Sequence, residues 1–186
     1  SMLDYSINSS LVFSNIALKK GDKAGLITYS DKIGTMLAAE RGGGQMRRIQ
    51  DALYNQKTQY KESNFELLYQ SIRRTVHSRS LLVLFTNFET EFAMRRAMPY
   101  LRKLNQKHVL MVVFFQNSEL QELAFQPSKS IHEVYQSAVA ERMISIKSKV
   151  ARELRQNGIQ TVLTLPEELS INTINKYLEL KAKGAI

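Results

Sequence analysis

The stretch LLVLFTNFET, residues 81–90, joins five apolar side chains directly to polar ones. A short apolar run with polar boundaries is typical of a strand that is buried on both faces of a sheet. In open α/β sheets, ligands bind beyond the carboxyl ends of such strands. The stretch therefore predicts a core strand, and it places Thr86 and Asn87 where a binding loop would begin.

Outward from this strand, the hydrophobic pattern alternates between strands and helices. Further strands are predicted at Asp22–Ser30, Thr35–Glu40, His108–Phe115 and Ile159–Leu165. Helices are predicted at Asp4–Lys20, around Met46–Leu53 and Phe65–Val76, at Glu89–Lys107 with a kink or break at Pro99, at Ile131–Gln156, and from Pro166 onward. This spacing predicts one mostly parallel sheet with helices on both faces, and with Thr35–Glu40 as an antiparallel edge strand.

The composition indicates a single domain with a basic surface. The 186 residues are 44% hydrophobic, which is enough for one sizeable core. Lys and Arg number 26 against 17 acidic residues, a net charge of +9 that permits anionic partners without selecting one. The absence of cysteine excludes disulfides and thiolate metal sites. No apolar run reaches the about 18 residues that a membrane span needs, and residues 1–10 lack a signal-peptide pattern.

Two weak patterns point to anions or to catalysis. The glycine cluster RGGGQMRR, residues 41–48, matches neither a Walker loop nor a dinucleotide loop, so it is interpreted as a turn before a helix, with Arg47 and Arg48 as weak anion-binding candidates. Basic pairs recur on separate predicted helices, whereas nucleic-acid binders concentrate charge on one face. No GxSxG motif is present, and His77 and His108 precede strands. We therefore expect no enzyme and no specific nucleic-acid partner. The alternatives are a hydrolase that uses the strand-end cleft, or an anion or nucleic-acid binder.

Polar side chains follow several of the predicted strands or precede helices. They occur in TYSDK (28–32), ESNF (62–65) and FTNFE (85–89), and Mg²⁺ accepts such oxygen ligands. A competent ion site needs a well-placed carboxylate, however, and Asn87 is neutral. Capping of the next helix by Thr86 or Asn87 is the favoured interpretation.

Three segments carry a resemblance to a known family. LDYSINSSLVFSNIALKKGDKAGLITYSDKIG (3–34), RSLLVLFTNFE (79–89) and INTINKYLELKAKG (171–184) together resemble the bacterial domain-of-unknown-function family fifty-eight. The resemblance implies a von Willebrand factor A-like domain over residues 1–186, with a Rossmann-like three-layer sandwich. It also implies a metal-ion-dependent adhesion site made from an Asp-x-Ser-x-Ser motif, a second-loop Thr and a third-loop Asp.

The chain departs from that pattern at the first and third loops. Ser63 stands at the position of the Thr, Asn87 stands at the position of the Asp, and no Asp-x-Ser-x-Ser precedes Asp4. The resemblance therefore implies a degenerate or incomplete ion site and no bound cofactor, with Mg²⁺ expected only if the parent protein supplies the motif upstream.

The first, central strand of such a domain is also expected to be missing. The chain would then be an N-terminally truncated fragment of a longer protein. Gly25–Tyr29 and Leu81–Phe85 would either leave a gap or close up on each other. An open edge of this kind favours pairing between chains, such as a strand-exchanged homodimer.

The resemblance implies a bacterial adaptor that partners a MoxR-type ATPase or an envelope complex. It would be cytoplasmic, or membrane-associated through segments outside this chain. We expect a non-enzymatic protein-binding domain whose partner surface lies at the carboxyl ends of the strands. Its candidate residues are Ser30, Asp31, Ser63, Asn64, Thr86, Asn87 and Glu89.

Overall fold

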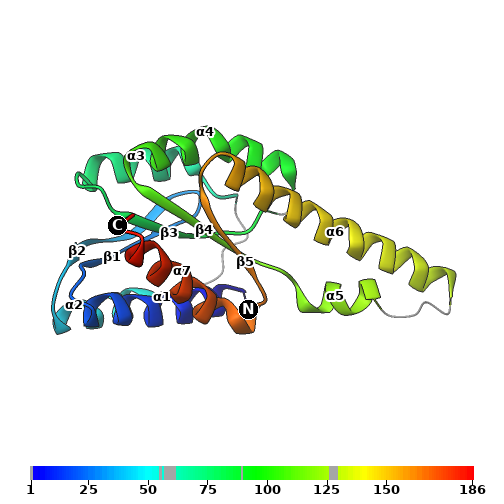
Figure 1. Ribbon diagram of the computed structural model, residues 1–186, viewed down its shortest axis with the longest axis horizontal. Coiled ribbons are helices and arrows are strands. Elements are labelled where there is room, and N and C mark those ends of the chain that lie inside the picture. Colours follow the sequence, from blue (N-terminus) through cyan, green and yellow to red (C-terminus); the bar gives the residue numbers. More distant parts are fainter. Residues whose placement is uncertain (1, 55, 57–61, 89, 126–129) are drawn as a thin grey trace.

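The computed structural model describes residues 2–54, 56, 62–88, 90–125 and 130–186. Within these residues the chain forms five strands and seven α-helices (Figure 1). The strands are β1 (Ala24–Tyr29), β2 (Ile33–Glu40), β3 (Leu81–Phe85), β4 (Val109–Phe115) and β5 (Gln160–Thr164). The helices are α1 (Met2–Lys19), α2 (Gly43–Tyr54), α3 (Phe65–Thr75), α4 (Glu91–Lys107), α5 (Ser118–Phe125), α6 (Ile131–Gln156) and α7 (Leu169–Ala182), with a short 3₁₀ helix at Pro166–Glu168.

The strands form two separate sheets. β1 and β2 make an antiparallel hairpin, as predicted, while β3, β4 and β5 form a parallel sheet in that order. Among the described residues, no strand pairs with β1 opposite β2 or with β3 opposite β4. One mostly parallel sheet was predicted and two sheets are observed, and of the two outcomes expected for a missing strand, the gap is the one observed. The two carboxyl ends lie together, because Tyr29 at the end of β1 hydrogen-bonds to Thr86 just after β3.

The open edge of β3 has the composition of a central strand. All five of its residues are apolar, yet four are only partly buried, whereas all seven residues of β4 are buried. The Thr86 N–H donates to Val113 O (3.1 Å) and the Val109 N–H donates to Ser80 O (3.0 Å). Because backbone groups alternate sides along a strand, the N–H and C=O of Leu81, Val83 and Phe85 point toward the open edge.

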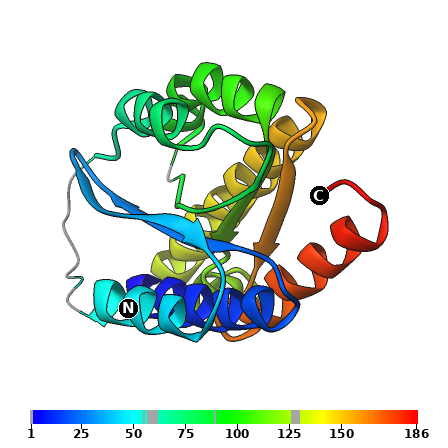
Figure 2. The same ribbon diagram turned by 90° about the vertical axis from the view of Figure 1, so that its left-hand side faces the viewer.

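Helices cover both faces of the strands (Figure 2). Leu82 and Leu84 of β3 point into a core shared with α3, α4 and α6. Val83 and Phe85 point to the other face, where α1 and α7 contribute Phe13 and Leu169. On that same side, α2 packs against α1 and the hairpin in a smaller core. The chain is thus an α/β domain in which helices sandwich an interrupted set of strands.

Gln45 fixes α2 to the hairpin. It is buried, and its Nε2 donates to the carbonyl oxygens of Ala24 (2.7 Å) and Ala38 (2.8 Å), on β1 and β2 respectively. One amide therefore donates to a backbone acceptor on each strand of the hairpin. The glycine cluster is a turn followed by a helix, as predicted: Gly42 has φ 97°, and α2 starts at Gly43.

The last helix is held by a polar cluster at the start of β1. The Asp22 carboxylate accepts hydrogen bonds from the Lys181 ammonium (2.6 Å) and from the Tyr177 hydroxyl. The Tyr177 ring packs edge-on against Phe13 of α1, with 5.2 Å between centroids. These contacts join the C-terminal helix to the first two elements of the chain.

α5 and the first part of α6 form an arm that projects from the body (Figure 1). The Ser137 Oγ donates to Ala124 O (3.1 Å) and so holds α6 against α5. Where α6 reaches the body, the Lys147 Nζ donates to Phe115 O (2.5 Å) at the carboxyl end of β4. We refer to α5 and residues 131–146 of α6 as the arm.

The predicted elements agree with the observed ones apart from their ends. α6 has the predicted bounds, and α4 runs through Pro99 as one helix, so the predicted break there was wrong. Much of the linker predicted between the second and third helices lies outside the described residues. No helix of the described residues is both long enough and apolar enough to cross a membrane.

Gln45→Ala is expected to lower the free energy of unfolding by about 2 kcal/mol, because two buried carbonyl groups lose their donor. Urea denaturation measures this change. Gln50→Ala, an exposed position on the same helix, is the control and should shift stability by less than about 0.5 kcal/mol. Equal effects of the two substitutions would contradict the anchoring role of Gln45.

His108 is expected to make the protein acid-sensitive. It is buried, and desolvation followed by the charge of Lys107 lowers its pKa from 6.5. The unfolded chain therefore takes up a proton more readily, so stability is complete above pH 6.5 and falls as the pH decreases. His108→Gln should flatten this fall in denaturation curves from pH 7 to 5, whereas His77→Gln at an exposed position should not.

Candidate functional site

Tyr29 joins the three strand-end segments that the sequence singles out. Its hydroxyl hydrogen-bonds with the side chains of Ser63, before α3, and Thr86, after β3. Burial raises the pKa of Tyr29 to about 12, and the two hydrogen bonds oppose that rise. The structure thus brings Ser63 and Thr86 together through a residue that the sequence analysis placed only in a strand.

The first two segments are also linked through the backbone. The Asn64 N–H donates to Ser30 O (2.9 Å), and the Ser30 Oγ donates to Asp31 Oδ1 (2.9 Å). The Asn64 side chain caps α3 by accepting from the Leu67 N–H (2.9 Å). Ser30, Asp31, Ser63 and Asn64 therefore lie in one cluster, as the strand-end hypothesis predicts, but much of their hydrogen bonding is used to hold the loops.

The loop after β3 is anchored by an apolar residue. Phe88 is buried and stacks on Phe65 of α3, with 5.7 Å between centroids, and it meets Phe114 of β4 edge-on at 6.4 Å. Asn87 is exposed, and its Nδ2 lies 3.9 Å from the sulfur of Met2, so the start of α1 borders the same cluster. The sequence signal for this anchor was an aromatic residue within a polar run.

Neither Thr86 nor Asn87 caps α4. The Thr90 Oγ1 accepts from the Ala93 N–H (3.1 Å), so the capping prediction was wrong by three or four residues. The buried Phe88 explains the shift, because its ring must reach the core before the chain turns into the helix. Glu89, the last candidate residue, lies outside the described residues.

The donors at this cluster do not form a carboxylate-rich metal site. Asp31 is its one described carboxylate, Asn87 is neutral, and the Ser63 and Thr86 side chains hydrogen-bond with Tyr29. Across the described part of the chain, no group of three or more His, Asp or Glu residues is placed to hold an ion. Hard cations favour several oxygen ligands including carboxylates, so this donor set by itself fits such an ion poorly.

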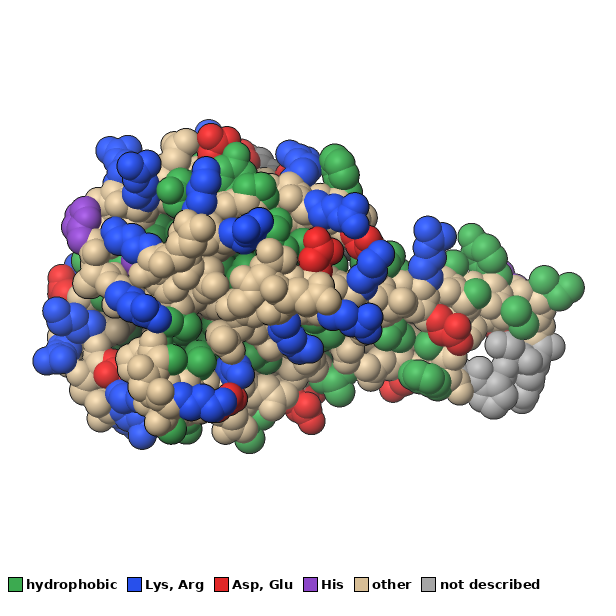
Figure 3. All heavy atoms as spheres, turned by 45° about the horizontal axis from the view of Figure 1, so that its top comes forward, with side chains coloured by type: hydrophobic (Ala, Val, Ile, Leu, Met, Phe, Trp, Pro, Cys, Tyr) green, Lys and Arg blue, Asp and Glu red, His purple; other side chains and the backbone are tan. Residues whose placement is uncertain are grey.

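The basic side chains are scattered, as predicted (Figure 3). Several of them form ion pairs on separate elements: Arg48 with Glu40 (2.8 Å), Arg96 with Glu62 (2.6 Å) and Lys149 with Glu91 (2.8 Å). The Lys149 ammonium lowers the pKa of Glu91 and joins α6 to α4. Arg48 is thereby engaged near the glycine turn, which leaves Arg47 as the more accessible of the two anion-binding candidates.

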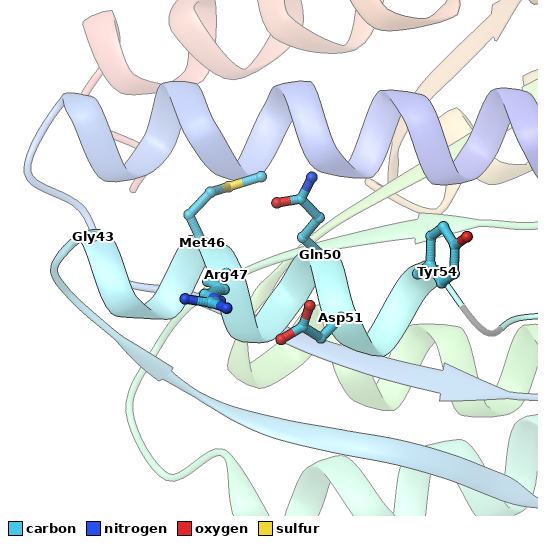
Figure 4. A pocket seen from close by; sticks show the side chains of 6 residues that line it. All are labelled: Gly43, Met46, Arg47, Gln50, Asp51 and Tyr54. Carbon is cyan, nitrogen blue, oxygen red and sulfur yellow. The ribbon is translucent and has the colours of Figure 1, made fainter.

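A depression on the surface of α2 involves Arg47 (Figure 4). All the residues that line it belong to this one helix: Gly43, Met46, Arg47, Gln50, Asp51 and Tyr54. Met46 and Gln50 point toward α1, while Arg47 and Asp51 point away from it. No second element of the described residues lines the depression, so it does not enclose a ligand.

These features define an α/β domain whose strand-end loops are tied to one another by hydrogen bonds and an aromatic anchor. Residues 4–158 match a family described as "Protein of unknown function DUF58". The match covers more than half of the 186 residues, so the chain belongs to this family, and the predicted membership is confirmed over that range. The helix α7 lies beyond the matched residues. No curated protein and no solved structure matches the chain.

Tyr29→Phe should reveal the hydroxyl contacts through alkaline denaturation. At neutral pH the substitution is expected to cost about 1 kcal/mol, since Ser63 and Thr86 each lose a partner. The raised pKa means that the unfolded chain ionises first, so the advantage of the native protein over the variant should shrink as the pH rises above 10. Tyr54→Phe, at an exposed position, is the control, and a pH-independent difference for Tyr29→Phe would contradict the assignment.

Proposed function

We propose that this chain is a non-enzymatic protein-binding domain of the von Willebrand factor A type that serves as an adaptor. One observation carries the proposal: among the described residues β1 and β3 each have an edge without a paired strand, and their carboxyl ends meet at the strand-end loops. Unpaired backbone groups on a strand edge are satisfied by another polypeptide strand. A surface of this kind fits a protein partner better than a small substrate.

The domain type is supported by the position of the interruption. The resemblance implies that a central first strand belongs between the strands corresponding to β1 and β3, and the interruption falls at that place. A strand that completes the sheet could be supplied by another polypeptide, and a strand-exchanged homodimer is one form of this.

The partner surface comprises the strand-end cluster. Asn87 is exposed, Asp31 lies at its rim, and Tyr29, Ser63 and Thr86 hold the loops in one arrangement. A preorganised polar surface favours binding because little order is lost on association. The resemblance supplies the partner class, a MoxR-type ATPase or an envelope complex, and recognition would rest on hydrogen bonds and loop shape with a degenerate ion site.

Calorimetric titration with Mg²⁺ and Mn²⁺ tests the degenerate ion site. We expect no sub-millimolar binding to this chain, because the third-loop position holds the neutral Asn87. The matched variant is Ser63→Ala with Asn87→Ala. Sub-millimolar binding by the native protein that this double variant abolishes would overturn the proposal of a degenerate site.

Interferometry with a purified MoxR-type ATPase from the same source tests the adaptor role. Asn87→Ala should weaken binding about tenfold, corresponding to about 1.4 kcal/mol. Val83→Pro should also weaken it if a partner strand adds to β3, because proline removes an N–H that points to the open edge and leaves the β3–β4 pairing intact. Gln50→Ala on the far helix is the control. Undetectable binding of the native protein would remove this partner class.

A further inference from the structure

The arm carries an apolar stripe that the rest of the described chain does not cover. Five large apolar side chains of α6 lie on its exposed side, from 41% exposed at Val139 to 91% at Ile131. The members of this α6 stripe are Ile131, Val134, Tyr135, Val139 and Met143. At about 100° per residue, Ile131, Val134, Tyr135 and Val139 lie within about 140° of one another on the helix surface, and Met143 continues the row further round the helix. Figure 3 shows hydrophobic side chains on the surface of the arm's outer end.

The opposite face of the same helix is already occupied. Ala140 is buried, Ser137 hydrogen-bonds to α5, and Val150 and Leu154 further along pack in the main core. The α6 stripe is therefore a second apolar face on one helix. Several exposed apolar side chains that adjoin one another are typical of an interaction surface.

The charge of the arm argues against an anionic membrane as its partner. Residues 118–143 contain four Glu against Lys129 and Arg142, in a chain whose net charge is +9. Helices that bind anionic lipid surfaces carry Lys and Arg on their polar face. The arm is the acidic part of a basic protein, so a membrane surface would repel it.

We propose that the α6 stripe is the contact between two copies of this chain, paired antiparallel about a two-fold axis near Ala138. Such a contact is isologous, because each stripe packs on the same stripe of the other copy. Ala138 is small and lies in the stripe, which allows the two helices to approach closely at the crossing. Arg142 lies on the same side of the helix, where its long stem can cover apolar surface of the contact while its guanidinium reaches the rim.

The shape of the arm makes this arrangement accessible. Lys147 marks the point where α6 meets the end of β4, and the sixteen residues before it extend about 24 Å at the rise of an α-helix. Because the arm projects from the body (Figure 1), two arms can lie side by side with the bodies at opposite ends of the pair.

The available area matches a modest dimer. At the side-chain areas of large apolar residues, the exposed fractions leave roughly 600 Å² per copy, so a pair can bury at most about 1,200 Å² through the α6 stripe. Specific interfaces begin at about this size. The inference is independent of the proposed partner surface, which lies at the strand-end loops.

Light scattering after size exclusion, over a range of micromolar protein concentrations, tests the proposal. The native protein should approach the mass of a dimer, and Tyr135→Glu or Val139→Glu should raise the dissociation constant at least tenfold, since each buries a charge at the centre of the contact. Both positions are exposed, and circular dichroism checks that the variants fold. Ile171→Glu, an exposed apolar position on α7, is the matched control and should leave the dimer intact.

Val83→Pro separates this dimer from one formed through the open sheet edge. A dimer that survives Val83→Pro and is lost in Tyr135→Glu supports the α6 stripe. A dimer lost in Val83→Pro and retained in Tyr135→Glu overturns it in favour of edge pairing. A native protein that stays monomeric at all concentrations also overturns it, including one that sediments with anionic lipid vesicles through the arm.

The absence of cysteine allows a direct check of the axis. Ala138→Cys should cross-link to its own copy with a short bis-maleimide, because the two-fold axis brings the two thiols together. Tyr54→Cys, on the far helix α2, should not cross-link under the same conditions. Equal cross-linking of the two variants would overturn the antiparallel arrangement.

Discussion

The pairing of β4 with β3 on one side and β5 on the other is the constraint on which the rest of the structure depends. All seven residues of β4 are buried, and both partners run parallel to it in continuous register. Parallel strands cannot be joined by a tight turn, so each connection must cross a face of the sheet through a helix. The helices α4 and α6 follow from that requirement, and their shared core in turn fixes where the strand-end loops emerge.

Much of this architecture was predictable because its signals are local. Apolar runs of strand length and helical periodicity located all five strands, and the bounds of α6 were obtained without error. The pairing between strands is not a local signal. Nothing in LLVLF distinguishes a strand flanked on both sides from one with a vacant neighbour, so the residue pattern alone predicted one sheet where two exist. The expectation of a gap came from the family resemblance, and the partial exposure of β3 beside the buried β4 agrees with it.

The candidate site also has a part that the sequence predicted and a part that it did not. The structure brings together the candidate residues Ser30, Asp31, Ser63, Asn64 and Thr86. The carboxyl ends of β1 and β3 meet there although the two strands belong to separate sheets, and the segment before α3 joins them. The residues that hold the cluster were missed. Tyr29 and Phe88 are aromatic, so from the sequence they resemble ordinary core residues, and their roles depend on which loops their ring or hydroxyl happens to reach. The helix cap at Thr90 was missed for a related reason, since the depth of Phe88 sets how far the chain travels before it turns.

The hydrogen bond from Lys147 to the carbonyl of Phe115 has a mechanical consequence. The arm is joined to the body at one end only, and this contact lies close to that end. A load applied near Ile131 acts over the length of several helical turns and reaches the body through Val150 and Leu154 of α6 and through Lys147 at the last residue of β4. That residue precedes Gln116, whose N–H donates to Thr164 O at the end of β5. A force that bends the arm is therefore transmitted to the carboxyl ends of β4 and β5, the edge of the sheet from which the strand-end loops emerge.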